Sequence, residues 1–166
     1  MKSIALIGMP GCGKSTAGKL IAEKLNYTFV DMDLFIEEQF ETTVKELFAV
    51  GEERFRDCES KVCEILSNRE RTVISTGGGV VKRANNIKLL NKSCTVVFID
   101  RALEDILSDI DFGSRPLLAN DHRDNLIRLY NERYELYKNY CDFSVKNDSS
   151  IEELADKIIS KLNQNI

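Results

Sequence analysis

The residues best suited to chemistry lie near the start of the chain, where residues 8–15 read Gly-Met-Pro-Gly-Cys-Gly-Lys-Ser. This is a full match to GxxxxGKS, whose glycines let successive backbone N–H groups turn inward around phosphate oxygens. The helix expected to follow adds a favourable dipole for the same anion. Lys14 is expected to reach the β- and γ-phosphates of a nucleotide and the Ser15 hydroxyl to ligate Mg²⁺. The nucleotide-binding set in this loop, residues 8–16, is Gly11, Cys12, Gly13, Lys14, Ser15 and Thr16.

Two acids and two arginines could complete a site. Asp31 and Asp33 follow a short apolar run, so one carboxylate can serve Mg²⁺ through water while the other faces a substrate hydroxyl. The alternative is a pair of solvated acids at a helix N-terminus, where the dipole favours them. Arg56 and Arg133 suit a substrate carboxylate, because a guanidinium fork binds a carboxylate through two hydrogen bonds. Glu59 lies one helical turn after Arg56 and can hold it in place.

The pattern along the chain predicts strands that alternate with helices. Short apolar runs predict strands at 3–7, 28–31, 72–75, 95–100 and 143–145. Helical spacing predicts helices at 15–25, 33–69 with a capping box at Thr43 and a break near Gly51, 82–90, 102–108, 125–139 and 151–163. Residues 109–121 are less regular. The fold class is therefore α/β: a three-layer sandwich with a central five-stranded parallel sheet and helices on both faces.

In such a sheet, ligands bind beyond the carboxyl ends of the strands. Those ends here carry the glycine-rich loop, the pair Asp31 and Asp33, the run Gly77-Gly78-Gly79, and Asp100. We therefore expect these groups to converge in space. The three successive glycines permit close approach of the backbone to a ligand, although a tight turn without a ligand is the alternative.

Length, charge and cysteine content limit the classes of protein to which this chain can belong. The 166 residues suit one domain, 1–166, and the net charge of −4 argues against a nucleic-acid partner. No long apolar stretch predicts a membrane span or a signal peptide, so we expect a cytoplasmic protein, and the absence of a coiled-coil pattern favours a monomer. The five cysteines contain no CxxC pair and are expected to be free thiols. Cys12 either is reactive at the helix N-terminus or fills a position for a small residue.

A GTPase switch is excluded, because no Asp stands three residues before a Gly and the closest run to NKxD, Asn91-Lys92-Ser93-Cys94, lacks the acid. The remaining motifs, taken in order after the phosphate loop, resemble those of the shikimate kinase family of P-loop proteins across essentially the whole chain. They are Asp31-x-Asp33 with Ile36-Glu37, Gly51-Glu52-x-x-Phe55-Arg56-x-x-Glu59, Ser75-Thr76-Gly77-Gly78-Gly79, Arg115-Pro116-Leu117-Leu118, and Arg133 before Tyr137.

The resemblance implies transfer of the γ-phosphoryl group of MgATP to the 3-hydroxyl of shikimate, a step in the synthesis of chorismate and aromatic amino acids. It implies that Lys14, Asp33 and Arg115 are catalytic, with Arg115 on a mobile lid at about 109–121 and also contacting the nucleotide. It assigns Asp31 to the metal through water. It places substrate binding in a region at about 32–60 and on Asp33, Arg56, Gly77, Gly78, Gly79 and Arg133.

One departure and two alternatives stay open. Family members carry an arginine several residues before the lid motif, where it packs on adenine, but residues 107–112 here contain none. The adenine contact is expected from residues 147–151 or from the lid. A gluconate-type kinase is an alternative, because gluconate also has a carboxylate and hydroxyls. A nucleotide-binding module without turnover is another, although the catalytic set Lys14, Ser15, Asp33 and Arg115 is complete.

Overall fold

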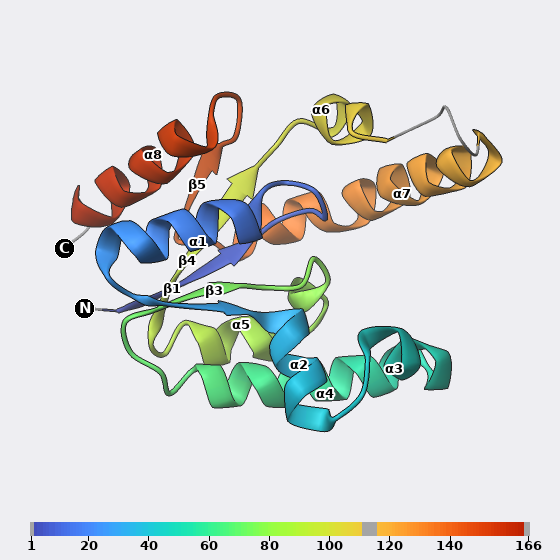
Figure 1. Cartoon of the computed structure of the whole chain (residues 1–166), viewed down its shortest axis with the longest axis horizontal. Coiled ribbons are helices and arrows are strands. Elements are labelled where there is room, and N and C mark those ends of the chain that lie inside the picture. The colour runs from blue at the N-terminus through green and yellow to red at the C-terminus, as the bar shows by residue number, and fades with distance from the viewer. Residues whose placement is uncertain (1, 111–115, 165–166) are drawn as a thin grey trace.

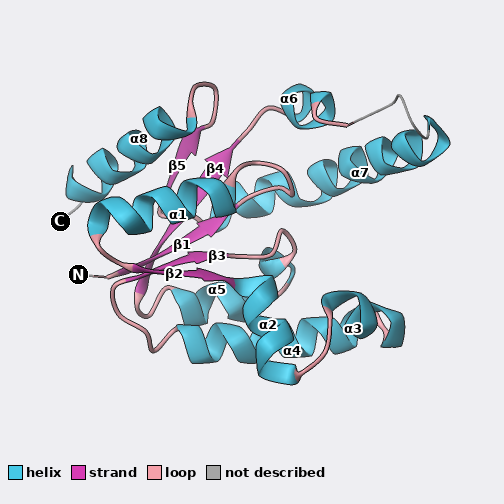
Figure 2. Ribbon diagram, in the orientation of Figure 1, coloured by secondary structure: helices cyan, strands magenta, loops and turns pink. Residues whose placement is uncertain are grey.

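A single parallel sheet organises the chain (Figures 1 and 2). The computed structural model describes residues 2–110 and 116–164, with the backbone alone for 116–119. The strands are β1 (Ser3–Ile7), β2 (Thr28–Asp31), β3 (Thr72–Ser75), β4 (Cys94–Asp100) and β5 (Phe143–Lys146). Their order is β2-β3-β1-β4-β5, and every neighbouring pair is parallel. The predicted five-stranded parallel sheet is thus confirmed.

Helices cover both faces of the sheet (Figure 1). On one face α1 (Lys14–Leu25) packs beside α8 (Ile151–Gln164). On the other lie α4 (Glu52–Leu66), α5 (Ala84–Leu90) and α7 (Pro116–Tyr140). The remaining helices are α2 (Met32–Phe40), α3 (Val44–Val50), α6 (Leu103–Ser108) and the 3₁₀ turn η1 (Val80–Lys82). None of the helices in these described ranges has the length and apolar character needed to cross a bilayer.

Local sequence signals fix where several helices begin. Asp31 caps α2, since its carboxylate accepts from the backbone N–H groups of Asp33 and Leu34. Thr43 and Glu46 form the predicted capping box of α3. The Ser150 hydroxyl accepts from the N–H of Glu153 at the start of α8. Each cap satisfies backbone donors that a helix leaves unpaired in its first turn.

Two sequence-based boundaries are wrong. The region 33–69 was expected as a helical stretch broken near Gly51, but it also breaks earlier, where Glu41 takes a left-handed conformation at the end of α2. The region 109–121 was expected to be irregular, yet α7 begins at Pro116. Proline suits the first position of a helix, because its fixed φ is already helical and the N–H that it lacks would be unpaired there. Half of the expected lid is therefore helix.

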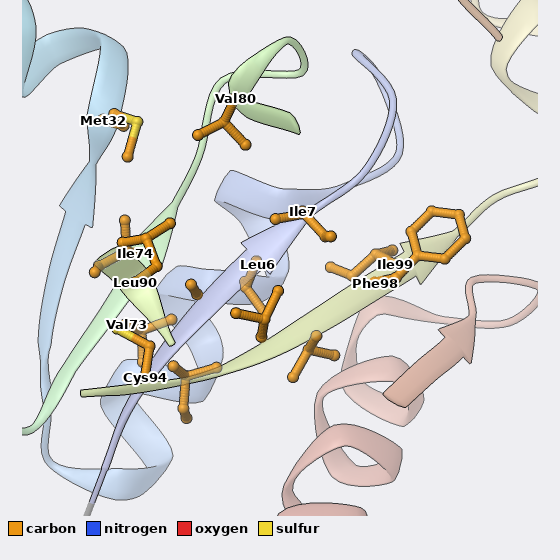
Figure 3. Packing of buried hydrophobic residues seen from close by; sticks show 14 of the residues in the cluster. Leu6, Ile7, Met32, Val73, Ile74, Val80, Leu90, Cys94, Phe98 and Ile99 are labelled. Carbon is orange, nitrogen blue, oxygen red and sulfur yellow. The ribbon is translucent and has the colours of Figure 1, made fainter. Parts of the chain in front are cut away.

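The core lies along the sheet and reaches the edge where the strands end. Figure 3 shows Leu6 and Ile7 of β1 between Ile74 of β3 and Ile99 of β4, with Val80 near the end of β3. All five residues of β1 and all four of β3 are buried. This packing holds the loops that leave these strands on a rigid base, which is what a site built from such loops needs.

Candidate active site

All five strands deliver polar groups to one edge of the sheet. β1 leads into the glycine-rich loop, β2 ends at Asp31, and β3 leads into Gly77–Gly79. β4 and β5 end beside Arg101 and Asn147. The predicted convergence of the loops after β1, β2 and β3 is present, because one cavity of about 350 Å³ is lined by all three: Pro10, Gly11, Gly13, Lys14, Ser15, Thr16, Asp31, Asp33, Ser75, Thr76, Gly77 and Gly78.

The glycine-rich loop is wrapped around the side chain of Lys14. The Lys14 ammonium donates to the carbonyls of Gly8 and Met9 at 2.8 and 2.9 Å, and the side chain is buried. Gly13 takes a left-handed conformation directly before α1, so the first N–H groups of α1 face the cavity without intrahelical partners. Cys12 is fully buried beneath the loop, which favours the interpretation as a small packing residue over that as an exposed, reactive thiol.

Three oxygen-bearing side chains meet at the mouth of this loop. The Ser15 hydroxyl lies 2.9 Å from Asp31 Oδ2 and 2.9 Å from the Ser75 hydroxyl. Hard cations such as Mg²⁺ take oxygen ligands of this kind, and usually only one or two of them from the protein. Within the described residues, no group of three His, Cys, Asp or Glu side chains is placed to hold a metal ion. The donor set therefore fits Mg²⁺ held jointly with phosphates.

Asp33 lines the cavity of the phosphate loop and lies within reach of the charge of Arg56. Burial raises the pKa of its carboxyl, and the nearby charge of Asp31 raises it further, whereas Lys14 and Arg56 oppose the shift. The charges of Lys14 in the phosphate loop and of Arg56 in α4 thus both act on Asp33. That position suits a group that orients a hydroxyl between two anionic partners.

A buried ion pair lies against the glycine run. Arg56 donates to Glu59 at 2.9 Å, and both side chains are almost inaccessible to solvent. Glu52 lies 3.3 Å from the other guanidinium nitrogen. Two atoms here are buried without a hydrogen-bond partner among the described residues, Glu59 Oε2 and Arg133 Nε. Because buried polar atoms are normally paired, these two atoms indicate that a further polar group binds here.

Two aromatic rings support Arg56. Phe48 and Phe55 stack with their centroids 4.4 Å apart, and the guanidinium carbon of Arg56 lies 5.9 and 5.1 Å from the two rings. Phe55 is buried, whereas Phe48 is 43% exposed. A guanidinium stacked on aromatic faces is held in orientation while its edge stays free for hydrogen bonds. Phe55 is therefore a core residue that also orients Arg56.

The loop after β3 must lack side chains to fit among these groups. A Cβ on Gly77 would lie 3.0 Å from Glu59 Oε2 and 3.2 Å from Asp33 Oδ1. A Cβ on Gly79 would overlap the guanidinium of Arg56. The backbone of this loop therefore lies directly against the acid and the arginine, which a ligand bound to them must also contact.

The middle glycine joins the two halves of the site. A Cβ on Gly78 would lie 2.9 Å from the Pro10 ring of the phosphate loop and 3.4 Å from Arg133 Nη1. The phosphate loop, the glycine run and α7 therefore meet at one backbone position. Arg133 is buried there and is separated in sequence from both loops.

A second cavity, also of about 350 Å³, lies beyond the phosphate loop. Its lining residues are Arg101, Asp105, Asn147, Asp148, Ser149 and Ile151. Arg101 donates to the carbonyl of Gly11 at 2.8 Å and to Asp109 at 2.6 Å, and Asn147 donates to the carbonyl of Cys12 at 2.9 Å. The cavity is thus tied to the loop by two hydrogen bonds and includes the 147–151 segment that the sequence suggested for an adenine contact.

The site residues expected from the sequence lie close together in the structure wherever they fall within the described ranges. Arg115 lies outside the described residues. Sequence reasoning gave no role to Ser75 or Arg101, although Ser75 opens the motif before the glycine run. Arg101 carried no local signal, because its partners Gly11 and Asp109 are identified only by the folded chain.

The Arg56–Glu59 pair predicts an unusual pH dependence of stability. Arg56→Met should lower the free energy of unfolding by about 3 kcal/mol at neutral pH, because it leaves the Glu59 carboxylate buried without its partner. Burial raises the pKa of Glu59 and Arg56 opposes that rise, so the substitution raises the pKa further. A carboxyl whose pKa is raised in the folded state makes the protein less stable as the pH rises through that folded pKa. The loss of unfolding free energy in Arg56→Met should therefore shrink on acidification, as measured by urea denaturation between about pH 5 and pH 8.

The double variant Arg56→Met/Glu59→Gln is the control, since it lacks the Glu59 carboxyl whose titration is at issue. Its deficit relative to wild type should vary less with pH than that of Arg56→Met. A deficit of Arg56→Met that stays constant over the whole range would contradict this account of the pair.

Comparisons with known proteins agree with the geometry. A family model described as shikimate kinase matches residues 10–163. A shikimate kinase of Clostridium botulinum (strain Alaska E43 / Type E3) is 48% identical over 155 residues, which cover 93% of each chain. The structure of a shikimate kinase from Acinetobacter baumannii in complex with shikimate matches with a TM-score of 0.89 at 30% identity, over 99% of this chain and 94% of that one. That from Aquifex aeolicus matches with a TM-score of 0.82 at 34% identity, over 98% and 97%. The chain belongs to the shikimate kinase family.

Proposed function

We propose that this chain transfers the γ-phosphoryl group of ATP to the 3-hydroxyl of shikimate, giving shikimate 3-phosphate and ADP. The observation that carries the proposal is the pair of buried guanidinium groups, Arg56 and Arg133, which lie against the glycine run beside the cavity of the phosphate loop. Such a pair suits an acceptor that has a carboxylate at one end and a hydroxyl at the other. Shikimate has both.

The donor half of the site is the phosphate loop. The first N–H groups of α1 bind the phosphates of ATP, and Lys14 exchanges its contacts with the loop carbonyls for the β- and γ-phosphates. Ser15 would hold Mg²⁺ directly, and Asp31 and Ser75 would hold it through water. When bound, Mg²⁺ neutralises charge that develops on the phosphate oxygens.

The acceptor half sets the direction of attack. Arg56 and Arg133 bind the carboxylate of shikimate, and N–H groups of the loop Gly77–Gly79 bind its ring hydroxyls. Asp33 accepts a hydrogen bond from the 3-hydroxyl and takes its proton as the oxygen bonds to the γ-phosphorus. The bond from that phosphorus to the β–γ bridging oxygen breaks, and ADP leaves. Catalysis of this kind is mainly positioning and charge stabilisation.

Parts of the proposal depend on the sequence alone. Arg115, on a lid at about 109–121, is expected to stabilise the charge of the transferring group as the lid closes. The region at about 32–60 is expected to close on the acceptor. A monomer and a cytoplasmic location likewise stay predictions from the sequence.

The adenine base is proposed to lie in the second cavity. A planar guanidinium and an aliphatic side chain, Arg101 and Ile151, line the same space beside the phosphate loop. A flat aromatic base can stack between such groups, with cation–π attraction on the arginine side. Asp109 holds Arg101 in place, so the family's missing pre-lid arginine is replaced by one from the end of β4.

Arg101→Ala tests this base site. Loss of one stacked guanidinium should raise the KM for ATP about tenfold and leave the KM for shikimate nearly unchanged. Arg128→Ala is the matched control, because Arg128 is exposed on α7 and its partners among the described residues, Glu132 and Asn125, belong to the same helix. An unchanged KM for ATP in Arg101→Ala would place the base elsewhere.

The central assay measures ADP release with shikimate, gluconate and nucleoside monophosphates as acceptors. Turnover with shikimate alone is the expected result, because the acceptor site binds a carboxylate with two arginines and holds a ring against Gly77–Gly79. Turnover with gluconate but not with shikimate would favour the gluconate-type alternative. Binding of MgATP without turnover on any acceptor would instead favour a nucleotide-binding module.

A further inference from the structure

A tyrosine that takes no part in the proposed chemistry lies directly beneath the glycine run. Tyr137 follows Arg133 by one helical turn on α7 and is fully buried. Its ring stacks on Phe98 of β4, with centroids 5.3 Å apart. Its hydroxyl donates to the carbonyl of Gly78 at 2.5 Å and lies 4.0 Å from the sulfur of Met9. The side chain therefore contacts both the phosphate loop and the acceptor loop.

The Tyr137 hydroxyl is protonated and fixed in place, so it can donate a hydrogen bond at this position. Burial raises the pKa of Tyr137, although the charge of Arg133 and its hydrogen bond to the hydroxyl oppose the shift, so the hydroxyl keeps its proton at neutral pH. The stacked ring cannot swing away without losing its contact with Phe98. The hydrogen bond to Gly78 thus comes from a fixed point on the core of the sheet.

Fixing the carbonyl of Gly78 also fixes a donor that faces the site. A trans peptide unit is planar, and its C=O and N–H point in opposite directions. The described chain contains no cis peptide bond, so the N–H of Gly79 points away from Tyr137. No acceptor for that N–H is present among the described residues, and Gly79 lies against the Arg56 guanidinium. Its donor is therefore free for a ligand that Arg56 also binds.

Three successive glycines need such an anchor. Glycine has the widest choice of backbone conformations, so a run of three loses much entropy when it is ordered. The run has no side chains of its own to hold it. The carbonyls of Gly77 and Gly79 accept hydrogen bonds from the N–H groups of Val80 and Lys82, whereas the carbonyl of Gly78 accepts from the Tyr137 hydroxyl.

We propose that Tyr137 is a positioning residue for the acceptor. Its hydroxyl sets the plane of the Gly78–Gly79 peptide so that the N–H of Gly79 is preorganised to bind shikimate, and the proposal rests on the proposed function. Because Arg133 and Tyr137 share one face of α7, the arginine that binds the carboxylate and the tyrosine that orients the loop are held in register. The phosphate loop contributes Met9 and Pro10 to the same junction.

Tyr137→Phe tests the inference, because it keeps the ring and removes only the hydroxyl. Loss of one buried hydrogen bond that orients a donor should raise the KM and the Kd for shikimate about tenfold, with the KM for ATP nearly unchanged. Hydrogen–deuterium exchange should also be faster in residues 76–82 than in the wild type. Steady-state kinetics, calorimetry and mass spectrometry measure the three quantities.

Tyr134→Phe is the matched control. Tyr134 lies on the same helix, its ring also contacts Phe98, and its hydroxyl donates to Asp100 rather than to the glycine run. The control should bind shikimate and exchange residues 76–82 as the wild type does. If the wild type turns over shikimate but the two variants have equal KM and Kd values for shikimate and equal hydrogen–deuterium exchange in residues 76–82, the inference is refuted.

A purely structural role would lower the melting temperature of Tyr137→Phe and weaken both substrates alike, and that result would also overturn the inference. A wild type that does not turn over shikimate would refute the proposed function and the inference with it. The wild-type assay, run first, therefore separates the two failures.

Discussion

The site depends on a charged pair that the fold has removed from water. Arg56 and Glu59 face each other at 2.9 Å on α4, and burying them is costly unless each finds all its partners. The glycine run fits against them because it has no side chains, and Arg133 approaches from α7 with one nitrogen still unpaired. Glu59 Oε2, an acceptor, and Arg133 Nε, a donor, have no hydrogen-bond partner among the described residues, and the acceptor substrate is proposed to bind beside them.

The two substrates are kept in register by packing between loops that are far apart in sequence. Gly78 lies so near Pro10 of the phosphate loop that a Cβ would not fit between them, and the Tyr137 hydroxyl contacts Gly78 directly and lies close to Met9. Both loops leave adjacent parallel strands, β1 and β3, whose residues are all buried. A rigid sheet edge thereby sets the distance between donor and acceptor, while the sequence of each loop decides what it binds.

The sequence predicted the parts of the molecule that local patterns encode. The phosphate loop, the five strands, the capping box at Thr43 and the grouping of Asp33 with Gly77–Gly79 followed from spacing, resemblance and the geometry of parallel sheets. The start of α7 was missed because Pro116 lies in the stretch 109–121 that was expected to be irregular, whereas proline suits the first position of a helix. Ser75, Arg101 and Tyr137 could not be given roles, since their partners lie 60, 90 and 59 residues away and only folding brings them together.

A crystal structure of the chain with shikimate and MgADP tests the central claim most directly. The account predicts that the carboxylate of shikimate contacts both Arg56 and Arg133, with the 3-hydroxyl in hydrogen-bond range of Asp33 and facing the phosphate loop. A carboxylate bound away from the two arginines, or a ring turned so that the 3-hydroxyl points away from Lys14 and Asp33, would contradict it.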